Sequence, residues 1–448
     1  MKWLKRILIG AGLVLVTLVG LALVIPLFVS IDDYLPRIEK EVSARLKEPV
    51  SIAKIRFSVF PVPHVVIDGI TVGKTADLKV GKVTLTPELL SLLSATKVLR
   101  SIEIDSLEMT QRALDKIPVW SSAKTDEPPA LRVGSIRLDD ALVKLDAASF
   151  GPFDGRVRLD AEGEPTEVSI VTRDGKLKAL IIPDASKANY AISASAKSWK
   201  VPVGPPIVFD ELEVRGVATL RDATFNQFNA KLYGGSVNGS ANLAWQKGLQ
   251  LKGKFDVAQL ELKNLVPLLS PGTRVSGRLN AKPVFSASAP EAGKLMNALH
   301  LESPFNVQGG VLHGVDIQKA ATRMLGGGGS GGETQFDRLS GYLALDRGTY
   351  KFTQLNISSG VMAADGNVGI SPKKDLSGRV NAKLNVVGTS TSVALNVAGT
   401  VESPTLLPTG GTVAGAAIGT MVLPGIGTGV GAKAGQMIEG LFGKKPAR

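Results

Sequence analysis

Few residues in this chain have the types and spacing that chemistry requires. Residues 68–75, DGITVGKT, come close to a phosphate-binding loop, but Asp68 stands where that motif needs glycine. The residues that follow alternate as in a strand, so no helix N-terminus is expected there to hold a phosphate. Residues 429–434, GVGAKA, match the glycine pattern of a dinucleotide site, but they lack its preceding strand and its later acidic residue. We therefore interpret residues 68–75 as a turn between strands and predict no cofactor site.

The acid–base and metal-ligating residues form no recognisable group either. The three histidines, His64, His300 and His313, are not spaced as the ligands of a helical metal site. No G-x-S-x-G nucleophile motif occurs, and the absence of cysteine excludes disulfides and thiolate metal sites. Asp139 and Asp140 are predicted to be turn residues between strands, not an acid–base pair. The sequence thus predicts no catalytic and no metal-binding residues, and it does not favour an enzyme.

The basic charge balance is spread along the chain. The formal net charge is +12, with 52 Lys and Arg against 40 Asp and Glu. The basic side chains occupy alternating positions without a dense cluster, which is typical of the solvated faces of strands. We therefore predict no nucleic-acid partner. A weak attraction to anionic lipid headgroups is the alternative consequence of this charge.

The N-terminus has the pattern of a membrane anchor. Lys2, Lys5 and Arg6 precede residues 7–29, which carry no charge, and about 20 apolar residues are enough to cross a bilayer. A cleaved signal peptide is the alternative, but the apolar run is long for one and lacks a small-x-small cleavage site. We predict an uncleaved anchor in residues 1–30, with everything after it outside the cytoplasm. The predicted anchor includes Ile7, Leu15, Leu23 and Val29.

Beyond the anchor, the periodicity predicts one helix followed by many strands. Leu35, Ile38, Val42 and Leu46 have helical spacing. From residue 50 to 401, apolar and polar residues alternate in roughly two dozen segments, the pattern of antiparallel strands with one wet face. Short helices are expected at 87–94, 260–269, 290–300 and 314–325. The polar, proline-rich residues 121–130 suggest a boundary.

A sheet with this pattern must cover its apolar face, either by rolling onto itself or by binding something else. The predicted fold is mainly β, an elongated, curved antiparallel β-sheet that forms a groove. At about 4.8 Å per strand it would extend on the order of 110 Å. A sandwich or several barrels is the alternative.

The C-terminal tail is apolar and rich in glycine. Residues 406–432 carry no charge, and glycine recurs at every fourth position in two runs, a spacing that lets helices approach closely in an apolar medium. We predict a helical hairpin here, with a second membrane span or an irregular glycine-rich tail as the alternatives. The glycines concerned are Gly411, Gly415, Gly419, Gly427, Gly431 and Gly435.

Two stretches of the chain are closely similar. SPGTRVSGRLNAK at 270–282 and SPKKDLSGRVNAK at 371–383 share Ser-Pro, Ser-Gly-Arg and Asn-Ala-Lys at one offset. The similarity stops where these stretches end, so we predict a turn followed by a strand, used twice, and not a duplicated domain. Leu279 and Val380 are expected to face inward, and Arg278 and Arg379 to face the polar side.

Taken together, these pieces resemble the AsmA family of Gram-negative envelope proteins. At the N-terminal end the resemblance lies in the anchor, in residues 31–74 and in residues 87–109, although Glu48-Pro49 stands where the family often has Gly-Arg or Gly-Lys-Pro. At the C-terminal end the glycines and apolar residues of 309–316, 339–341 and 366 fall where the family pattern expects them. Residues 130–290 are similar only in style.

The resemblance implies a division into five parts. These are the anchor at 1–30, an AsmA-like N-terminal β region with a juxtamembrane helix at 31–120, a middle repetitive sheet at 121–300, an AsmA-like C-terminal β domain at 301–404 and the glycine-rich tail at 405–448.

The resemblance also implies a role in outer-membrane biogenesis, for a protein anchored in the bacterial inner membrane with its bulk in the periplasm. The expected activity is handling of phospholipids in a hydrophobic β-groove, with inner-membrane lipids, phospholipid acyl chains and other envelope proteins as partners. The alternative is a structural or regulatory factor for outer-membrane protein assembly and targeting, without a conduit. The residues expected on the lipid-contacting face are Val237, Leu243, Trp245, Leu251, Phe255, Leu376, Val380 and Leu384.

Overall fold

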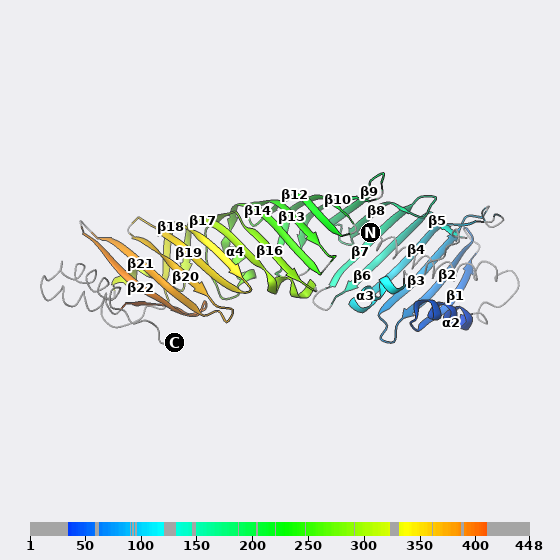
Figure 1. Cartoon of the computed structure of the whole chain (residues 1–448), viewed down its shortest axis with the longest axis horizontal. Helices are drawn as coiled ribbons and strands as arrows, with labels where there is room; N and C mark the ends of the chain where they lie inside the picture. The colour runs from blue at the N-terminus through cyan, green and yellow to red at the C-terminus, as the bar shows by residue number, and fades with distance from the viewer. Residues whose placement is uncertain are drawn as a thin grey trace. The chain divides into compact units, whose positions relative to one another are not determined.

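The computed structural model describes residues 35–409 except 59–61, 90, 92–93, 95, 121–130, 146–148, 187, 203–204, 220, 247, 291, 323–330, 361 and 387–388. The predicted anchor (with Ile7, Leu15, Leu23 and Val29), the boundary at 121–130 and the tail (with Gly411, Gly415, Gly419, Gly427, Gly431 and Gly435) lie outside these residues. Within them, no helix has the length and apolar character needed to cross a membrane. The chain divides into two compact units, Met1–Gln227 and Phe228–Arg448 (Figure 1).

The first unit is a sheet of strands joined mostly in sequence order. Its strands are β1 (Val50–Ser58), β2 (His64–Val72), β3 (Leu78–Pro87), β4 (Lys97–Thr110), β5 (Leu131–Val133), β6 (Ser135–Lys144), β7 (Ser149–Leu159), β8 (Pro165–Thr172), β9 (Leu177–Pro183), β10 (Tyr190–Lys200) and β11 (Val208–Ala218). The described pairings from β1 to β4 and from β6 to β11 are antiparallel. The strand β12 (Asp222–Leu232) contains the boundary between the units.

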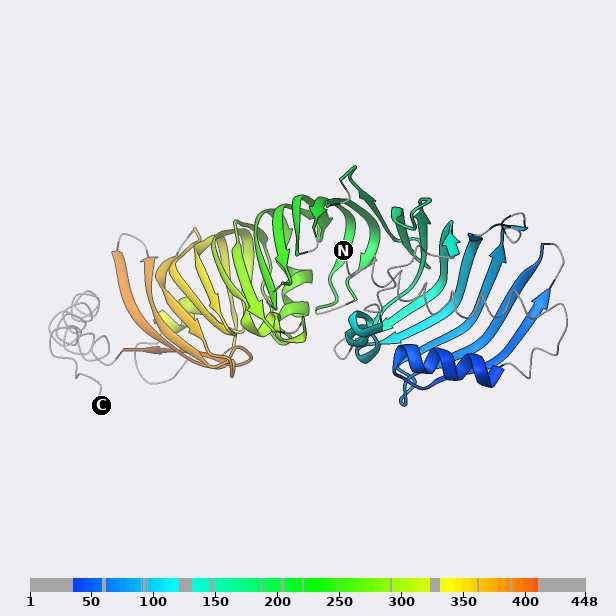
Figure 2. The same ribbon diagram turned by 45° about the vertical axis from the view of Figure 1, so that its right-hand side comes forward.

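A helix covers the start of this sheet, as the sequence predicts. Ile38, Val42 and Leu46 on α2 (Leu35–Leu46) are buried, and they form one core with residues of β1 to β4 such as Ile67 and Leu99. Figure 2 shows α2 lying along these strands. The helix also protects the open edge of β1, because Glu39 Oε1 and Ser43 Oγ accept hydrogen bonds from backbone N–H groups of β1 at 2.7 and 2.9 Å.

The expectation of a purely antiparallel sheet is wrong at one place. The strand β4 pairs in parallel with β5 and β6. A parallel pair needs a crossover that returns the chain to the same end of the sheet. The helix α3 (Gln111–Trp120) lies between β4 and β5 in the chain, where that connection is required. The sequence reasoning had not predicted α3, so it had no reason to expect a change of direction.

Three of the bulges in these strands are completed in the same way. A residue with left-handed backbone geometry donates its N–H to an Asp or Asn side chain on the next strand, which satisfies the group that the bulge removes from the ladder. The pairs are Asp140 (φ 60°) with Asp154 at 3.0 Å, Gln259 (φ 56°) with Asn280 at 3.1 Å and Gln354 (φ 52°) with Asn367 at 3.0 Å. The interpretation of Asp139 and Asp140 as turn residues is therefore wrong, since both lie inside β6.

The second unit is built almost wholly of antiparallel strands. They are β13 (Gly235–Ala244), β14 (Leu249–Glu261), β15 (Arg278–Ala281), β16 (Val284–Ala289), β17 (His300–His313), β18 (Glu333–Asp346), β19 (Thr349–Ser358), β20 (Met362–Ile370), β21 (Leu376–Val386), β22 (Thr389–Gly399) and β23 (Pro404–Pro408). The short strands β15 and β16 share one place between β14 and β17.

Two helices close one end of this unit. Ile317, Ala320 and Ala321 of α5 (Ile317–Thr322) and Leu262 of α4 (Leu262–Leu269) are buried with the apolar residues of β17 to β23. The expected helices at 260–269 and 314–325 are thus confirmed in shorter form. The region 290–300 contains two short 3-10 segments, η3 (Ala292–Lys294) and η4 (Met296–Ala298). The mainly β class is confirmed, whereas the elongation and curvature of the whole chain stay predictions.

Candidate functional site

The most distinctive surface of the second unit is an apolar strip that is only half buried. Along β14, Leu251 and Phe255 are half buried, while their neighbours Lys252, Lys254 and Asp256 are exposed. The alternation places the apolar side chains on one face of the strand and the charged ones on the other. This strand therefore has one wet face and one apolar face that water still reaches.

Strand pairing extends the strip from β14 onto β13 and β16, and Phe228 extends it to β12. In the antiparallel register, Leu251 stands opposite Leu243 of β13 and Ala287 of β16, and opposed residues lie on the same face. Phe228, Phe255 and Phe285 follow one another across the strands, with ring centroids 5.0 and 5.3 Å apart. We call Phe228, Leu243, Leu251, Phe255 and Phe285 the phenylalanine strip.

Glycines make room for these rings. Gly239 stands opposite Phe255, and Gly253 stands opposite Phe285. A Cβ atom built at either glycine would lie 2.4 Å from the facing ring, closer than carbon atoms can approach. Each ring thus lies over a neighbouring backbone, where an aromatic side chain shields an otherwise bare strand position. The result is an apolar surface in which the rings of Phe255 and Phe285 lie over glycines.

The helices of this unit cover the other end of the same sheet. The helix α5 packs against β18, β21, β22 and β23, and α4 joins the same buried core. Leu395 and Ala382 in that core are fully shielded from solvent. The apolar face is therefore self-packed over β20 to β23 and accessible over β13, β14 and β16.

This difference separates the residues that the sequence placed on one lipid-contacting face. Val237, Leu243, Leu251 and Phe255 lie on the half-buried part, and Trp245 just beyond β13 is 39% exposed. Val380 and Leu384 are buried in the helix-covered core, and Leu376 packs against it. The sequence reasoning missed Phe228 and Phe285. Their signal was a phenylalanine set opposite a glycine, which becomes visible only once the strand register is known.

A charged network in the first unit has a structural explanation. Lys116 Nζ of α3 bonds to Asp77 Oδ2 at 2.9 Å and to Glu48 Oε1 at 2.7 Å, and Thr75 Oγ1 donates to Asp77 Oδ1 at 2.6 Å. The hydrogen bond from Thr75, followed by that from Lys116, holds the pKa of the buried Asp77 carboxyl below its usual value. This network fastens α3 to the turn before β3 and to the chain just after α2.

The three histidines lie apart and have local partners. His64 Nδ1 lies 2.7 Å from the carbonyl oxygen of Val62, and His313 Nδ1 lies 2.7 Å from Glu333 Oε1. His300 lies 3.6 Å from Glu302. Within the described part of the chain, no three potential metal ligands converge. Of residues 68–75, interpreted as a turn between strands, 73–75 lie in a turn at 73–76, whereas 68–72 belong to β2.

Comparison with protein families identifies the region that carries the strip. Residues 218–355 match the model of the AsmA family. The chain contains an AsmA family domain. The matched region runs from the end of β11 into β19 and includes every residue of the phenylalanine strip. A search of curated proteins gave no match.

The AsmA match confirms the resemblance and overlaps only in part with the residues that suggested it. Residues 309–316 and 339–341 lie inside the match, whereas residues 31–74 and Gly366 lie outside it. The part of the middle region from residue 218 onward, which is similar to the family only in style, is included. Family and sheet together fit a bacterial envelope role or a role in bridge-like lipid transfer.

Proposed function

We propose that this AsmA-type protein is anchored in the bacterial inner membrane, lies mainly in the periplasm and binds phospholipid acyl chains on the phenylalanine strip during outer-membrane biogenesis. The observation that carries this proposal is the half-buried row of Phe228, Phe255 and Phe285 on a sheet face that neither α4 nor α5 covers. Monomeric proteins rarely leave such a contiguous apolar surface without a binding role.

The strip has the physical properties that an acyl chain requires. Burying one methylene group against an apolar surface contributes about 0.8 kcal/mol. Contact of several methylene groups with neighbouring strands therefore offsets the free energy that an acyl chain loses when it leaves the bilayer. Because the rings of Phe255 and Phe285 lie over Gly239 and Gly253, the facing strand positions add no side chain to the surface. The exposed lysines Lys252 and Lys254 belong to the opposite face, which leaves the strip without a buried charge.

The proposed role is binding and transfer without a chemical step. An acyl chain on this surface contacts carbon atoms of Leu and Phe side chains, which offer no nucleophile, acid or base. The lipid headgroup would remain at the solvated edge of the sheet.

A second candidate role has its own support. Over β20 to β23 the apolar face is consumed by internal packing, with Val380 at 8% and Leu384 at 6% exposure. A self-packed end of this kind suits a structural or regulatory factor in outer-membrane protein assembly that carries no lipid. The two roles differ in whether lipid contacts the strip in cells.

Photo-crosslinking in living cells tests the proposal. A photoreactive amino acid at Leu251 is expected to capture phospholipid, whereas the same residue at Lys252 on the opposite face is the matched control. The two positions are neighbours in one strand, so expression and membrane targeting should be equal. Absence of lipid adducts at Leu251, or equal capture at both positions, would refute lipid binding by the strip and favour the assembly role.

A further inference from the structure

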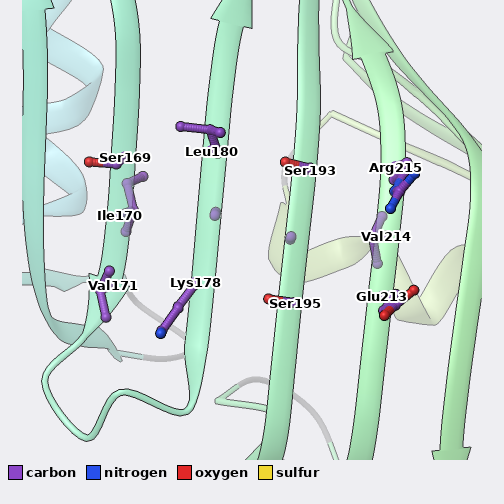
Figure 3. Close-up of a pocket in the computed structure, with 12 residues that line it drawn as sticks. Ser169, Ile170, Val171, Lys178, Leu180, Ser193, Ser195, Glu213, Val214 and Arg215 are labelled. Carbon is purple, nitrogen blue, oxygen red and sulfur yellow. The ribbon is translucent and has the colours of Figure 1, made fainter.

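The first unit has a hollow on the wet face of its sheet, remote in sequence from the phenylalanine strip. It has a volume of about 390 Å³ and is lined by β8, β9, β10 and β11. Figure 3 shows Ser193 and Ser195 of β10 between Lys178 and Leu180 on one side and Glu213 and Arg215 on the other.

Strand register explains why a hollow exists here. Ser193 stands opposite Leu180 and Arg215, and Ser195 stands opposite Lys178 and Glu213. Small serines on the middle strand are therefore flanked on both sides by long side chains of the same face. With strands about 4.8 Å apart, the two walls are roughly 9.6 Å apart. We call this depression along β10, with its walls on β9 and β11, the serine trough.

The trough continues into an apolar end. One step along the same face, Ala191 stands opposite Ile182 and Val217. Their side chains are 43% and 40% exposed, although they lie on a face where alternation predicts polar residues. A small floor between two exposed aliphatic walls extends the trough away from its charged end.

Charges at the serine end favour an anion. Lys178 and Arg215 contribute two positive charges against one negative charge from Glu213, and Arg156 stands opposite Ser169 at the rim. Neither Lys178 nor Arg215 takes part in an ion pair within the described part of the chain. Because Glu213 flanks Ser195, an anion is best placed nearer Ser193 and the Arg215 guanidinium, which can bind oxygen atoms in a bidentate manner.

We propose that the serine trough binds a phosphate-bearing amphiphile, with the phosphate at Ser193 and Arg215 and the apolar chain against Leu180, Ile182 and Val217. A phosphate offers enough oxygen atoms to accept from the serine hydroxyls and the guanidinium together, whereas a carboxylate offers two. This site is independent of the phenylalanine strip, since it lies in the other unit and on a wet sheet face.

Calorimetric titration of the purified full chain tests the assignment, with dodecyl phosphate below its micelle concentration as the probe. The substitution Arg215→Gln removes a charge-assisted bidentate contact and should weaken binding of dodecyl phosphate by about tenfold or more. Ser193→Leu fills the floor and should abolish the same binding. Arg379→Gln, a loss of one exposed cation on β21 in the other unit, is the matched control and should bind as the wild type does.

Further probes separate this site from binding at the strip. Dodecyl maltoside has the same chain without an acid, so any binding of it at the strip should be equal in all variants. Wild-type affinity for dodecyl phosphate in both Arg215→Gln and Ser193→Leu would overturn the proposal. Equal affinity for dodecanoate would overturn the choice of phosphate, and equal affinity for inorganic phosphate would overturn the role of the apolar end. Circular dichroism checks that each variant is folded.

Discussion

Gly253→Ala tests whether the phenylalanine strip is built on glycine. The backbone of Gly253 has ordinary strand geometry, so alanine is not excluded by its torsion angles. Space is the obstacle, because an added Cβ would lie 2.4 Å from Phe285 Cζ and 2.9 Å from the carbonyl oxygen of Ser240. The Phe285 ring must therefore move outward or the strands must separate.

The expected cost combines two effects. Forcing one extra carbon into a packed site costs about 1–3 kcal/mol, and moving Phe285 away from Phe255 loses a stacked pair worth about 0.5–1.5 kcal/mol. Against this, alanine in a strand is favoured over glycine by roughly 0.5–1 kcal/mol. The net loss of unfolding free energy is about 2 kcal/mol. For a unit of this size that lowers Tm by roughly 4–8 °C.

Thermal and urea unfolding of the full chain measure this loss. Gly293→Ala is the control, because nothing lies within 4 Å of a Cβ built there and its backbone has no left-handed angle. The control should match or slightly exceed wild-type stability. If Gly253→Ala unfolds with the control, the rings are not held over the glycines, and the surface proposed for acyl chains loses its structural basis.

Three further predictions concern single contacts. Asn367→Ala removes the acceptor for the Gln354 N–H and should lower the unfolding free energy by about 1 kcal/mol in urea titrations, whereas the exposed Asn356→Ala should not. Val42→Ala, at a side chain only 1% exposed, should cost about 2 kcal/mol in the same assay, and Lys40→Ala on the solvent side of α2 should cost nothing measurable. The pKa of Asp77 is lowered from 3.8 in the folded state. The ionised carboxylate therefore contributes fully to the free energy of unfolding above pH 3.8, and this contribution is lost as pH falls through the folded pKa. Asp77→Asn should therefore be less stable at pH 7 and show a shallower loss of stability below about pH 4. An unchanged acid profile would contradict that role.

The periodicity of apolar residues predicted most of the secondary structure. Apolar alternation located the strands, and the structure has 23 of them in its described part, close to the number expected. The spacing of Ile38, Val42 and Leu46 predicted α2 and its buried face. These features depend on residues close together in sequence, which is why a single sequence contains them.

The features that could not be predicted from the sequence depend on how the strands pair and in which register. The parallel pairing of β4 with β6 requires knowing where the crossover returns, and the bulge at Asp140 looks like a turn until its partner Asp154 is known. Likewise, alternation places both Leu251 and Val380 on an apolar strand face. The structure covers Val380 with helices and leaves Leu251 half buried. Pairing between strands determines strand direction, bulges and burial, and the hydropathy pattern of a single sequence contains almost no information about that pairing.

The repeated stretches at 270–282 and 371–383 show how far one local pattern determines structure. In both, the first serine carbonyl accepts from the N–H three residues later, at 3.1 and 2.8 Å, which confirms the predicted turn. Both Gly277 and Gly378 have positive φ and no room for a Cβ, and Leu279 and Val380 face the core while Arg278 and Arg379 are exposed.

The shared asparagines of the two stretches nevertheless have different partners. Asn280 accepts from the bulged Gln259, whereas Asn381 donates to Asp365 at 3.2 Å. The first stretch forms a strand of four residues and the second a strand of eleven. Identical residues thus fix the turn and the inward side chain, while the neighbouring strand determines what the polar side chains do. The two proposed binding surfaces follow the same rule, because the strip and the trough are both created by what stands opposite a small residue on the adjacent strand.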